Sequence, residues 1–328
     1  MSSSTATWEP SLLPDLTGRI ALITGGHSGL GLATTTHLVA KNAKVYIASR
    51  SLPKAAAAVR HIKDEHPAAQ VEILEMDLAD LKSVKRGADE FMKKERHLHI
   101  LINNAGIMCP PYSRTAQGIE TQFQTNYLSH YLLTSLLLPT LLTTARNPQT
   151  PANTVRIVNV SSDGHAKLAP KAGVSFGDVN LENASSWTRY GHSKLCQVLH
   201  AKALGQMYGR GEGQGGELVA VSLHPGTVKT DLSKGPRAST WWYRFIQPVV
   251  EKGAPGPEKG CWGIVWCAAS KELGEKMSEK VVDINGGYFE GVGILSKASK
   301  SGEDIEMAKT LWVWSEERLT ELDFLDCD

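Results

Sequence analysis

Two side chains that can move a proton stand four positions apart in the stretch YGHSK, Tyr190 to Lys194. Four residues make about one helical turn, so a helix would place the phenol and the ammonium on one face, with Cβ atoms roughly 5–6 Å apart. A phenol can donate a proton to a carbonyl oxygen when the carbon receives a hydride. An unperturbed phenol titrates near pKa 10, and a neighbouring cation would bring that pKa toward the working range. Because the same spacing is common on solvated helix faces, the pentapeptide alone does not decide.

A glycine-rich turn, TGGHSGLG at residues 24–31, lies between an apolar run and a segment of helical length. Such a turn lets the backbone approach a pyrophosphate and presents N–H groups at the positive end of a helix. Its glycine spacing differs from the GxGxxG fingerprint. We expect nucleotide binding by Gly25, Ser28, Gly29, Leu30 and Gly31. The alternative is a tight turn without a ligand.

The residues after the second apolar run favour a phosphorylated dinucleotide. A carboxylate at this position would hold a ribose 2′-hydroxyl, but the chain has Ser49, Arg50 and Ser51. Arg50 can form charge-assisted bonds to a 2′-phosphate, with Lys54 as a second cation. This pattern predicts NADP(H) rather than NAD, unless both cations are simply solvated.

Two further segments follow predicted strands and so face the same crevice. Asp77 is expected to meet the adenine edge, although a turn or helix-capping role is an alternative. Asn104, Ala105 and Gly106 are small enough to let a ribose approach, or else they form a structural turn.

Alternating strands and helices must position these residues. Short apolar runs predict seven buried strands, at 19–24, 44–49, 71–76, 100–103, 155–161, 218–223 and 288–289. Segments of helical length lie between them, at 30–41, 53–65, 81–94, 118–142, 190–208 and 260–269. This alternation predicts an α/β fold, doubly wound, with a mostly parallel seven-stranded sheet flanked by helices.

The chain is expected to form one domain, 18–328, preceded by a flexible N-terminal tail, 1–17. The stretch at about 231–258 is too long for a simple connection and predicts a substrate lid. Its aromatic cluster, Trp241 to Phe245, could close over a large apolar substrate or could pack the lid onto the body.

Composition excludes several classes of function. The 328 residues are 41% hydrophobic and carry a net charge of +1, so no global field attracts nucleic acid or an anionic membrane. Five cysteines without a CxxC pair argue against a disulfide framework or a metal site, and we expect a cytoplasmic location. The most apolar run, 131–142, has only 12 residues and is interpreted as a buried helix rather than a membrane span.

Six motifs occur in order along residues 16–289: TGGHSGLG, NNAG, FQTNYLSH, VNVSS, YGHSK and HPGTVKT. Together they resemble the short-chain dehydrogenase/reductase family, and the resemblance implies a single-domain Rossmann fold. The run YGHSKLCQVL, the late PGTVKTDL and a charged C-terminal helix are similar to its retinol-dehydrogenase-like branch, which includes many fungal oxidoreductases.

The resemblance implies four catalytic roles. Tyr190 would be the general acid/base, and Lys194 would support it and bind the nicotinamide ribose. Ser162 would orient the substrate carbonyl, with Ser161 as the competing choice. Asn126 would hold a water in a proton relay through Lys194, whereas local sequence alone suggests a solvated helix residue.

The resemblance also implies a nicotinamide-side loop formed by Pro225, Gly226, Val228 and Thr230. The Val228 backbone would bond the carboxamide, and Thr230 would contact the carboxamide or the pyrophosphate. A Pro-Gly turn without a ligand is the alternative.

These features predict an NADP(H)-dependent oxidoreductase that reduces a ketone or aldehyde, or oxidises the matching alcohol, of a moderately large lipophilic substrate. A reductase of an activated carbon–carbon double bond and a non-catalytic NADP-sensing interaction protein are the alternatives. Contact with a membrane through WWYRFIQPVV and a homodimer through the helices at 131–142 and after Tyr190 are left open.

Overall fold

A computed structural model describes residues 8–209, 218–228, 253–278 and 284–326. Thr230 and most of the expected lid, residues 231–252, lie outside the described residues. The aromatic cluster at 241–245 is outside them as well.

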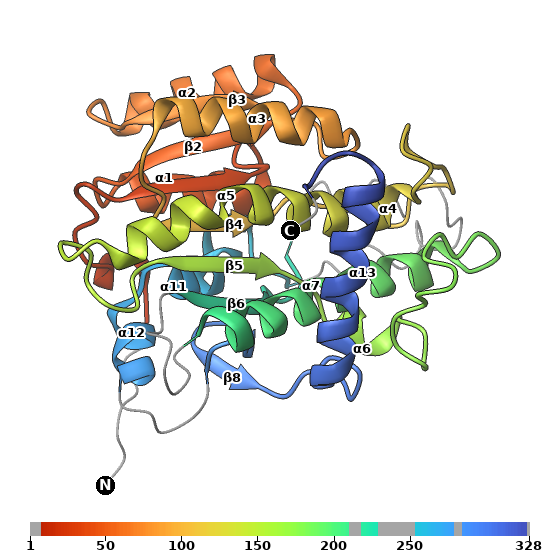
Figure 1. The fold of residues 1–328 in the computed structure, drawn as a ribbon. Coiled ribbons are helices and arrows are strands. Elements are labelled where there is room, and N and C mark those ends of the chain that lie inside the picture. The colour runs from red at the N-terminus through yellow and green to blue at the C-terminus, as the bar shows by residue number, and fades with distance from the viewer. Residues whose placement is uncertain (1–7, 210–217, 229–252, 279–283, 327–328) are drawn as a thin grey trace, which may run out of the picture.

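An eight-stranded sheet forms the centre of the molecule, in the order β3-β2-β1-β4-β5-β6-β7-β8 (Figure 1). The strands are β1 Ile20–Thr24, β2 Lys44–Ser49, β3 Val71–Glu75, β4 Ile100–Asn103, β5 Arg156–Val160, β6 Val219–His224, β7 Tyr288–Glu290 and β8 Ile294–Ser296. The first seven strands pair in parallel, as predicted, and β8 pairs antiparallel to β7. The eighth strand corrects the predicted count of seven. It is a three-residue edge strand joined to β7 by a tight turn in which Gly291 and Gly293 have positive φ.

Helices cover both faces of the sheet. They are α1 Gly29–Val39, α2 Leu52–Glu65, α3 Leu81–Lys94, α4 Thr121–Phe123, α5 Ser129–Arg146, α6 Gly164–Lys167, α7 Ser186–Tyr208, α10 Pro257–Gly260, α11 Trp262–Ala269, α12 Lys271–Ser278 and α13 Ile305–Glu321, with a 3-10 turn at Pro10–Leu12. The predicted doubly wound α/β architecture is confirmed.

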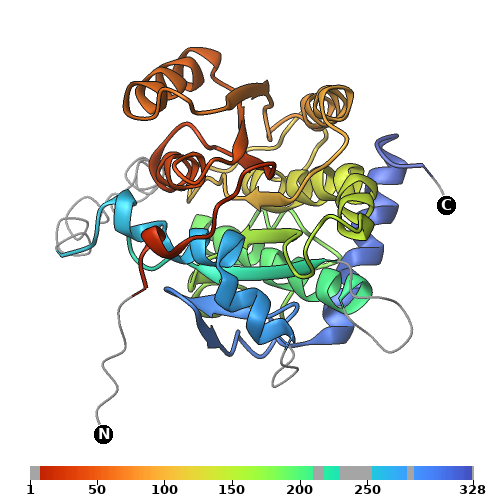
Figure 2. The same cartoon turned by 90° about the vertical axis from the view of Figure 1, so that its left-hand side faces the viewer.

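Alternation along the strands divides the core into two layers. In β1, Leu22 packs with buried residues of α3, α5, α7 and α13, whereas Ile23 packs with those of α1, α2 and α11. Figure 2, turned by 90°, shows α1 and α11 on one side of the sheet and α5 and α13 on the other.

The N-terminal segment corrects a predicted boundary. Trp8, Leu13 and Leu16 are buried in the layer that contains α1 and α11. Residues 8–17 therefore belong to the packed domain rather than to a loose tail, because their apolar side chains find a place beside α11.

One long helical stretch runs from Thr121 to Arg146 and contains α4, a π-helical segment at Gln124–Leu128, and α5. Among the described residues it is the one stretch with the length and hydropathy of a membrane span, and 61% of its apolar window is buried inside the protein. Leu132, Leu137 and Leu141 lie in the core against α3 and the sheet, so the segment is a core helix here.

The order of the strands reverses at β1. From β1 the chain first builds outward to β2 and β3, and it then returns to the other side of β1 to form β4. Ligands of doubly wound sheets bind at such a reversal, outside the carboxyl ends of the strands. Most of the predicted cofactor-binding residues follow these strand ends.

Candidate active site

The glycine-rich turn joins β1 to α1 in a backbone conformation that residues other than glycine rarely adopt. Gly25 and Gly29 have φ values of +67° and +52°, in the left-handed region. A Cβ on Gly31 would lie 2.3 Å from the carbonyl oxygen of Gly25, so the first turn of the helix sits directly against the loop. Ser28 is the N-cap residue but its side chain makes no capping bond. The first N–H groups of α1 are thus left for an anion, which fits the pyrophosphate of a dinucleotide.

The turn after β4 is fastened beside the glycine turn. Thr24 Oγ1 accepts hydrogen bonds from the backbone N–H groups of Asn104 and Ala105, each at 2.9 Å. The side-chain amide of Asn104 donates to the Thr24 carbonyl oxygen at 2.8 Å. A Cβ on Gly106 would lie 3.4 Å from Lys194 Nζ, so this turn reaches the proton-transfer residues. Thr24 was not predicted as a site residue, because its role depends on contacts with residues about 80 positions away.

Arg50 and Lys54 are exposed near the glycine turn. Burial lowers the pKa of His27, and the positive charges of Lys54 and Arg50 lower it further. The two predicted cations therefore act on the same region of the turn. Asp77 Oδ1 accepts a bond from the backbone N–H of Ala79 at 3.0 Å, which is the turn role left open by the sequence.

Helix α7 carries the predicted Tyr-Lys pair on one face. Ser185 caps its first turn by accepting the N–H of Thr188 at 3.0 Å. Tyr190 and Lys194 are both only 4% exposed, and the ammonium lies 5.8 Å from the centroid of the phenol ring. Lys194 Nζ donates to the carbonyl oxygen of Val160 at 2.8 Å, so the end of β5 fixes the lysine.

The geometry separates the two adjacent serines. Ser161 Oγ donates to the carbonyl oxygen of Lys194 at 2.8 Å and is buried under α7. Ser162 Oγ instead lies beside the Tyr190 ring, since a Cβ on Gly164 would be 3.2 Å from Tyr190 Cε1 and 3.4 Å from Ser162 Oγ. It accepts the N–H of Gly164 at 3.1 Å. Because side chains alternate along the chain at the end of a strand, only Ser162 faces the phenol.

The pKa values of the pair differ from the sequence expectation. Burial raises the pKa of Tyr190 above its usual range, and the neighbouring Ser162 hydroxyl offsets only part of this effect. Burial also lowers the pKa of Lys194 to about 8. In the protein itself the phenol therefore keeps its proton, because desolvation outweighs the effect expected of the lysine charge.

Asn126 lies in the π-helical segment and is fully buried, which excludes a solvated helix residue. Its side-chain oxygen accepts the N–H of Ile107 at 2.8 Å, and its amide donates to the Ile107 carbonyl oxygen and to Ser193 Oγ, each at 2.9 Å. The Asn126 carbonyl oxygen lies 2.9 Å from Nδ1 of His130. Single π-helical turns often occur at functional sites. Asn126 thereby ties the segment after Gly106 to α7.

The loop after β6 lies against the start of α1. Gly226 has φ +86°, which suits the predicted Pro225-Gly226 turn. A Cβ on Gly260 would lie about 2.5 Å from the methyl groups of Val228 and 3.1 Å from Leu30, so this loop, α10 and the glycine turn meet.

A polar group beside Ser162 was missed from the sequence. Ser162 Oγ donates to Asp163 Oδ1 at 3.1 Å, and Lys167 Nζ lies 2.6 Å from the other carboxylate oxygen. The nearest His224 nitrogen lies 3.9 Å from Oδ1. The sequence did contain a signal for this group, because Asp163 directly follows the serine at the end of a predicted strand. Among the residues that the structure describes, no group of three or more His, Cys, Asp or Glu side chains could hold a metal ion.

Comparison with known proteins now decides the family. The family model described as short chain dehydrogenase matches residues 19–175. The short-chain dehydrogenase/reductase drtF of Aspergillus calidoustus is 41% identical, covering 97% of this chain and 98% of its own length. The chain belongs to the short-chain dehydrogenase/reductase family. It is therefore an oxidoreductase.

Other relatives agree with the predicted branch of this family. Retinol dehydrogenase 11 of Mus musculus is 33% identical, with 90% of this chain and 85% of that protein covered. A crystal structure of an uncharacterized protein from Mycobacterium Paratuberculosis is 29% identical and superposes with a TM-score of 0.70, covering 96% of this chain and 98% of that one. The Pseudomonas aeruginosa RhlG/NADP active-site complex, 21% identical with a TM-score of 0.61 over 87% of this chain and 98% of that one, shares the fold.

Proposed function

We propose that this short-chain dehydrogenase/reductase uses NADP(H) to reduce a ketone or aldehyde, or to oxidise the matching alcohol, of a moderately large lipophilic substrate. The observation that carries the proposal is the place of the Tyr190 ring beside Ser162, where a Cβ on Gly164 would lie within 3.4 Å of both, with Lys194 on the same face of α7. These groups lie at the end of β5, and the Gly106 turn beside Lys194 connects them to the proposed dinucleotide site.

The proton chemistry follows from the state of these groups. Burial keeps Tyr190 protonated, so its phenol can donate a proton to the substrate oxygen as negative charge develops there. Ser162 can donate a hydrogen bond to the same oxygen and hold the carbonyl in place. The bound dinucleotide supplies the hydride for reduction, or receives it during alcohol oxidation.

The dinucleotide would be held by residues from several strand ends. The glycine turn from Gly25 to Gly31 suits the pyrophosphate, and Asn104 to Gly106 with Lys194 suit the riboses. Asp77 is proposed for the adenine edge, and Val228 and Thr230 for the carboxamide. Asn126 would order the water of the proton relay, because its bonds to Ile107 and Ser193 fix it next to α7.

We propose NADP(H) rather than NAD(H) because of the charged side chains that follow β2. Residues 49–51 contain no carboxylate for a 2′-hydroxyl, whereas Arg50 and Lys54 are exposed cations that both act on His27. The RhlG complex shows an NADP-bound protein with the same fold, but its low identity adds nothing on specificity.

Consumption of NADPH and of NADH by the purified protein tests this proposal, over a panel of aromatic, aliphatic and steroid-like carbonyls. We expect NADPH-dependent turnover that Arg50→Ala reduces while leaving NADH turnover low and unchanged. A preference for NADH would contradict the cofactor proposal. Binding of NADPH without turnover on any carbonyl would instead favour the NADP-sensing alternative. A cytoplasmic location, a homodimer and membrane contact stay predictions.

A further inference from the structure

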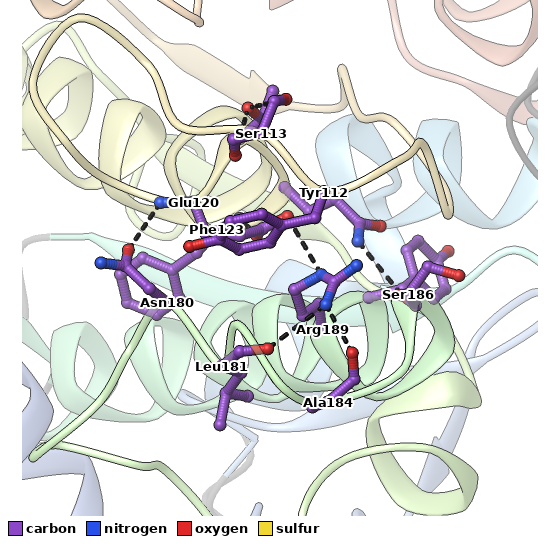
Figure 3. A network of polar contacts seen from close by, with 12 residues as sticks. Tyr112, Ser113, Glu120, Phe123, Asn180, Leu181, Ala184, Ser186 and Arg189 are labelled. Carbon is purple, nitrogen blue, oxygen red and sulfur yellow. Dashed lines mark hydrogen bonds and ion pairs between the residues drawn. The ribbon is translucent and has the colours of Figure 1, made fainter. Parts of the chain in front are cut away.

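A buried ion pair lies directly beside the proposed active site and connects two of its helices (Figure 3). Arg189 Nε lies 3.5 Å from Glu120 Oε1, and the two side chains are 6% and 1% exposed. Arg189 immediately precedes Tyr190, and Glu120 immediately precedes the helical stretch that contains Asn126. The pair joins residues 69 positions apart, so no local sequence pattern reveals it.

The guanidinium fixes the first turn of α7. Arg189 Nη1 donates to the carbonyl oxygens of Leu181 at 3.2 Å and Ala184 at 2.5 Å. Its guanidinium carbon lies 5.0 Å from the centroid of the Tyr112 ring, within the range of a cation–π contact. Arg189, the residue before Tyr190, is therefore held in place by the segment that precedes α7 and by the loop that contains Tyr112.

The carboxylate fixes the start of the other helix. Glu120 Oε2 accepts the backbone N–H of Phe123 at 2.8 Å and so caps α4. The backbone N–H of Glu120 donates to Asn180 Oδ1 at 2.7 Å, as Figure 3 shows. The π-helical segment with Asn126 begins directly after Phe123. The position of this segment therefore depends on the same carboxylate that meets Arg189.

A second pair of bonds runs beside the ion pair. Gln122 Nε2 donates to the carbonyl oxygen of Ser186, at the start of α7, at 3.1 Å. Gln122 Oε1 accepts the backbone N–H of Cys109 at 2.8 Å. The segment 107–109, the start of α4 and the start of α7 are thus connected by polar contacts from buried side chains.

The free-energy cost of burying the Glu120–Arg189 pair suggests that its role is to position the two helices. Removing two charges from water is costly, and the replacement of a buried pair by apolar residues is often neutral or stabilising. Burial raises the pKa of Glu120, even though bonds from Phe123 and Gln122 and the charge of Arg189 lower it. Such a pair adds little to stability for its cost. Each partner is fixed by its own hydrogen bonds, so the attraction between the two charges sets the relative placement of the two helices.

We propose that Glu120 and Arg189 are positioning residues that hold Tyr190 against Ser162 and in register with Asn126. The kinetic part of this inference rests on the proposed function. The structural part, the placement of the Tyr190 ring, does not.

Glu120→Gln tests the inference, since it removes the charge while keeping the size of the side chain and an oxygen that can cap α4. We expect kcat to fall about 10- to 100-fold with little change in NADPH affinity, because a misplacement of about 1 Å can cost that much in rate. Glu182→Gln is the matched control. Its ion pair with Arg114 joins the loops that precede α4 and α7, with a distance of 3.0 Å. The Glu182 and Arg114 side chains are 57% and 49% exposed, so we expect less than about a twofold change in kcat.

Placement of the ring is measured without turnover. Fluorine NMR of protein labelled with 3-fluorotyrosine, with the Tyr190 signal assigned through Tyr190→Phe, should show that this signal moves in Glu120→Gln. The signal of Tyr46, whose hydroxyl bonds Glu95, should stay in place. Arg189→Lys keeps the charge but loses the forked contacts to Leu181 and Ala184, and it should also move the Tyr190 signal.

An unchanged Tyr190 signal in a folded Glu120→Gln or Arg189→Lys protein would overturn the inference. So would a fall in kcat accompanied by an equal fall in Glu182→Gln. If the wild-type protein turned over no carbonyl, the proposed function would fail while the NMR result still decided the placement of Tyr190. If Glu120→Gln did not fold, Arg189→Lys would carry the same test.

Discussion

At the scale of single residues, Lys194 couples function to stability. Its pKa is lowered to about 8 by burial, from a usual 10.5. The folded state therefore binds fewer protons than the unfolded state between these values, and folding becomes more favourable as pH rises. Below pH 8 both states are protonated, and the cost of burying the ammonium is fully present.

This sign gives a prediction for Lys194→Met. Between pH 8 and pH 10.5 the free energy of unfolding of the wild type should rise, relative to the variant, by up to roughly 3 kcal/mol. Urea unfolding of both proteins at several pH values measures the difference. A difference that stays constant with pH would mean that Lys194 is not desolvated as described.

Asp163 should tune the acid of the reaction. Its negative charge is one of the causes that raise the pKa of Tyr190, after burial. In Asp163→Asn, the pH profile of kcat/KM should shift its Tyr190-dependent limb to lower pH, because the phenolate loses a repulsive neighbour. Glu306→Gln, in an exposed pair on α13, should leave the profile in place. A shift of the Asp163→Asn profile to higher pH would contradict the assignment.

At the scale of elements, the close approach of α7 to the segment after α6 depends on Gly191. A Cβ there would lie 2.4 Å from the backbone nitrogen of Ala169 and 2.5 Å from the carbonyl carbon of Leu168. These are backbone atoms, so the helix itself would have to move. The glycine in YGHSK is therefore part of the packing that brings Tyr190 to Ser162.

We expect Gly191→Ala to lower the free energy of unfolding by about 1–3 kcal/mol, as overpacking does, and to reduce turnover. Gly177→Ala is the control, because a Cβ at Gly177 meets nothing within 4 Å. Chemical denaturation of the two variants compares them directly. Equal stability of both would show that α7 is free to shift at this contact.

Some elements were predictable from the sequence and others were not, for physical reasons. Mostly apolar runs identify β1 to β6, because all of these strands except the edge strand β3 are almost fully buried. Strand β8 has two exposed residues among its three and shows no such pattern. The π-helical turn at Asn126 is invisible because it leaves the apolar content of the helix unchanged. Glu120 with Arg189, and Thr24 with Asn104, depend on distant residues that only the fold brings together.

At the scale of the whole molecule, the packed domain extends to Trp8. This side chain is 9% exposed and lies in the layer that contains α1 and α11. Trp8→Ala should lower the free energy of unfolding by roughly 3 kcal/mol, whereas Leu12→Ala, at a side chain that is 56% exposed, should change it by less than about 0.5 kcal/mol. Thermal and urea unfolding measure both. Equal effects would mean that the N-terminal segment is not held as described.

The central claim, hydride transfer from NADPH to a carbonyl with Tyr190 as acid, is tested most directly by the fate of deuterium carried on the nicotinamide of NADPH. We expect the label on the former carbonyl carbon of the product, with a rate about 10²- to 10⁴-fold lower in Tyr190→Phe, the usual contribution of a general acid. Label on a carbon that belonged to a carbon–carbon double bond of the substrate, or full activity in Tyr190→Phe, would contradict the account.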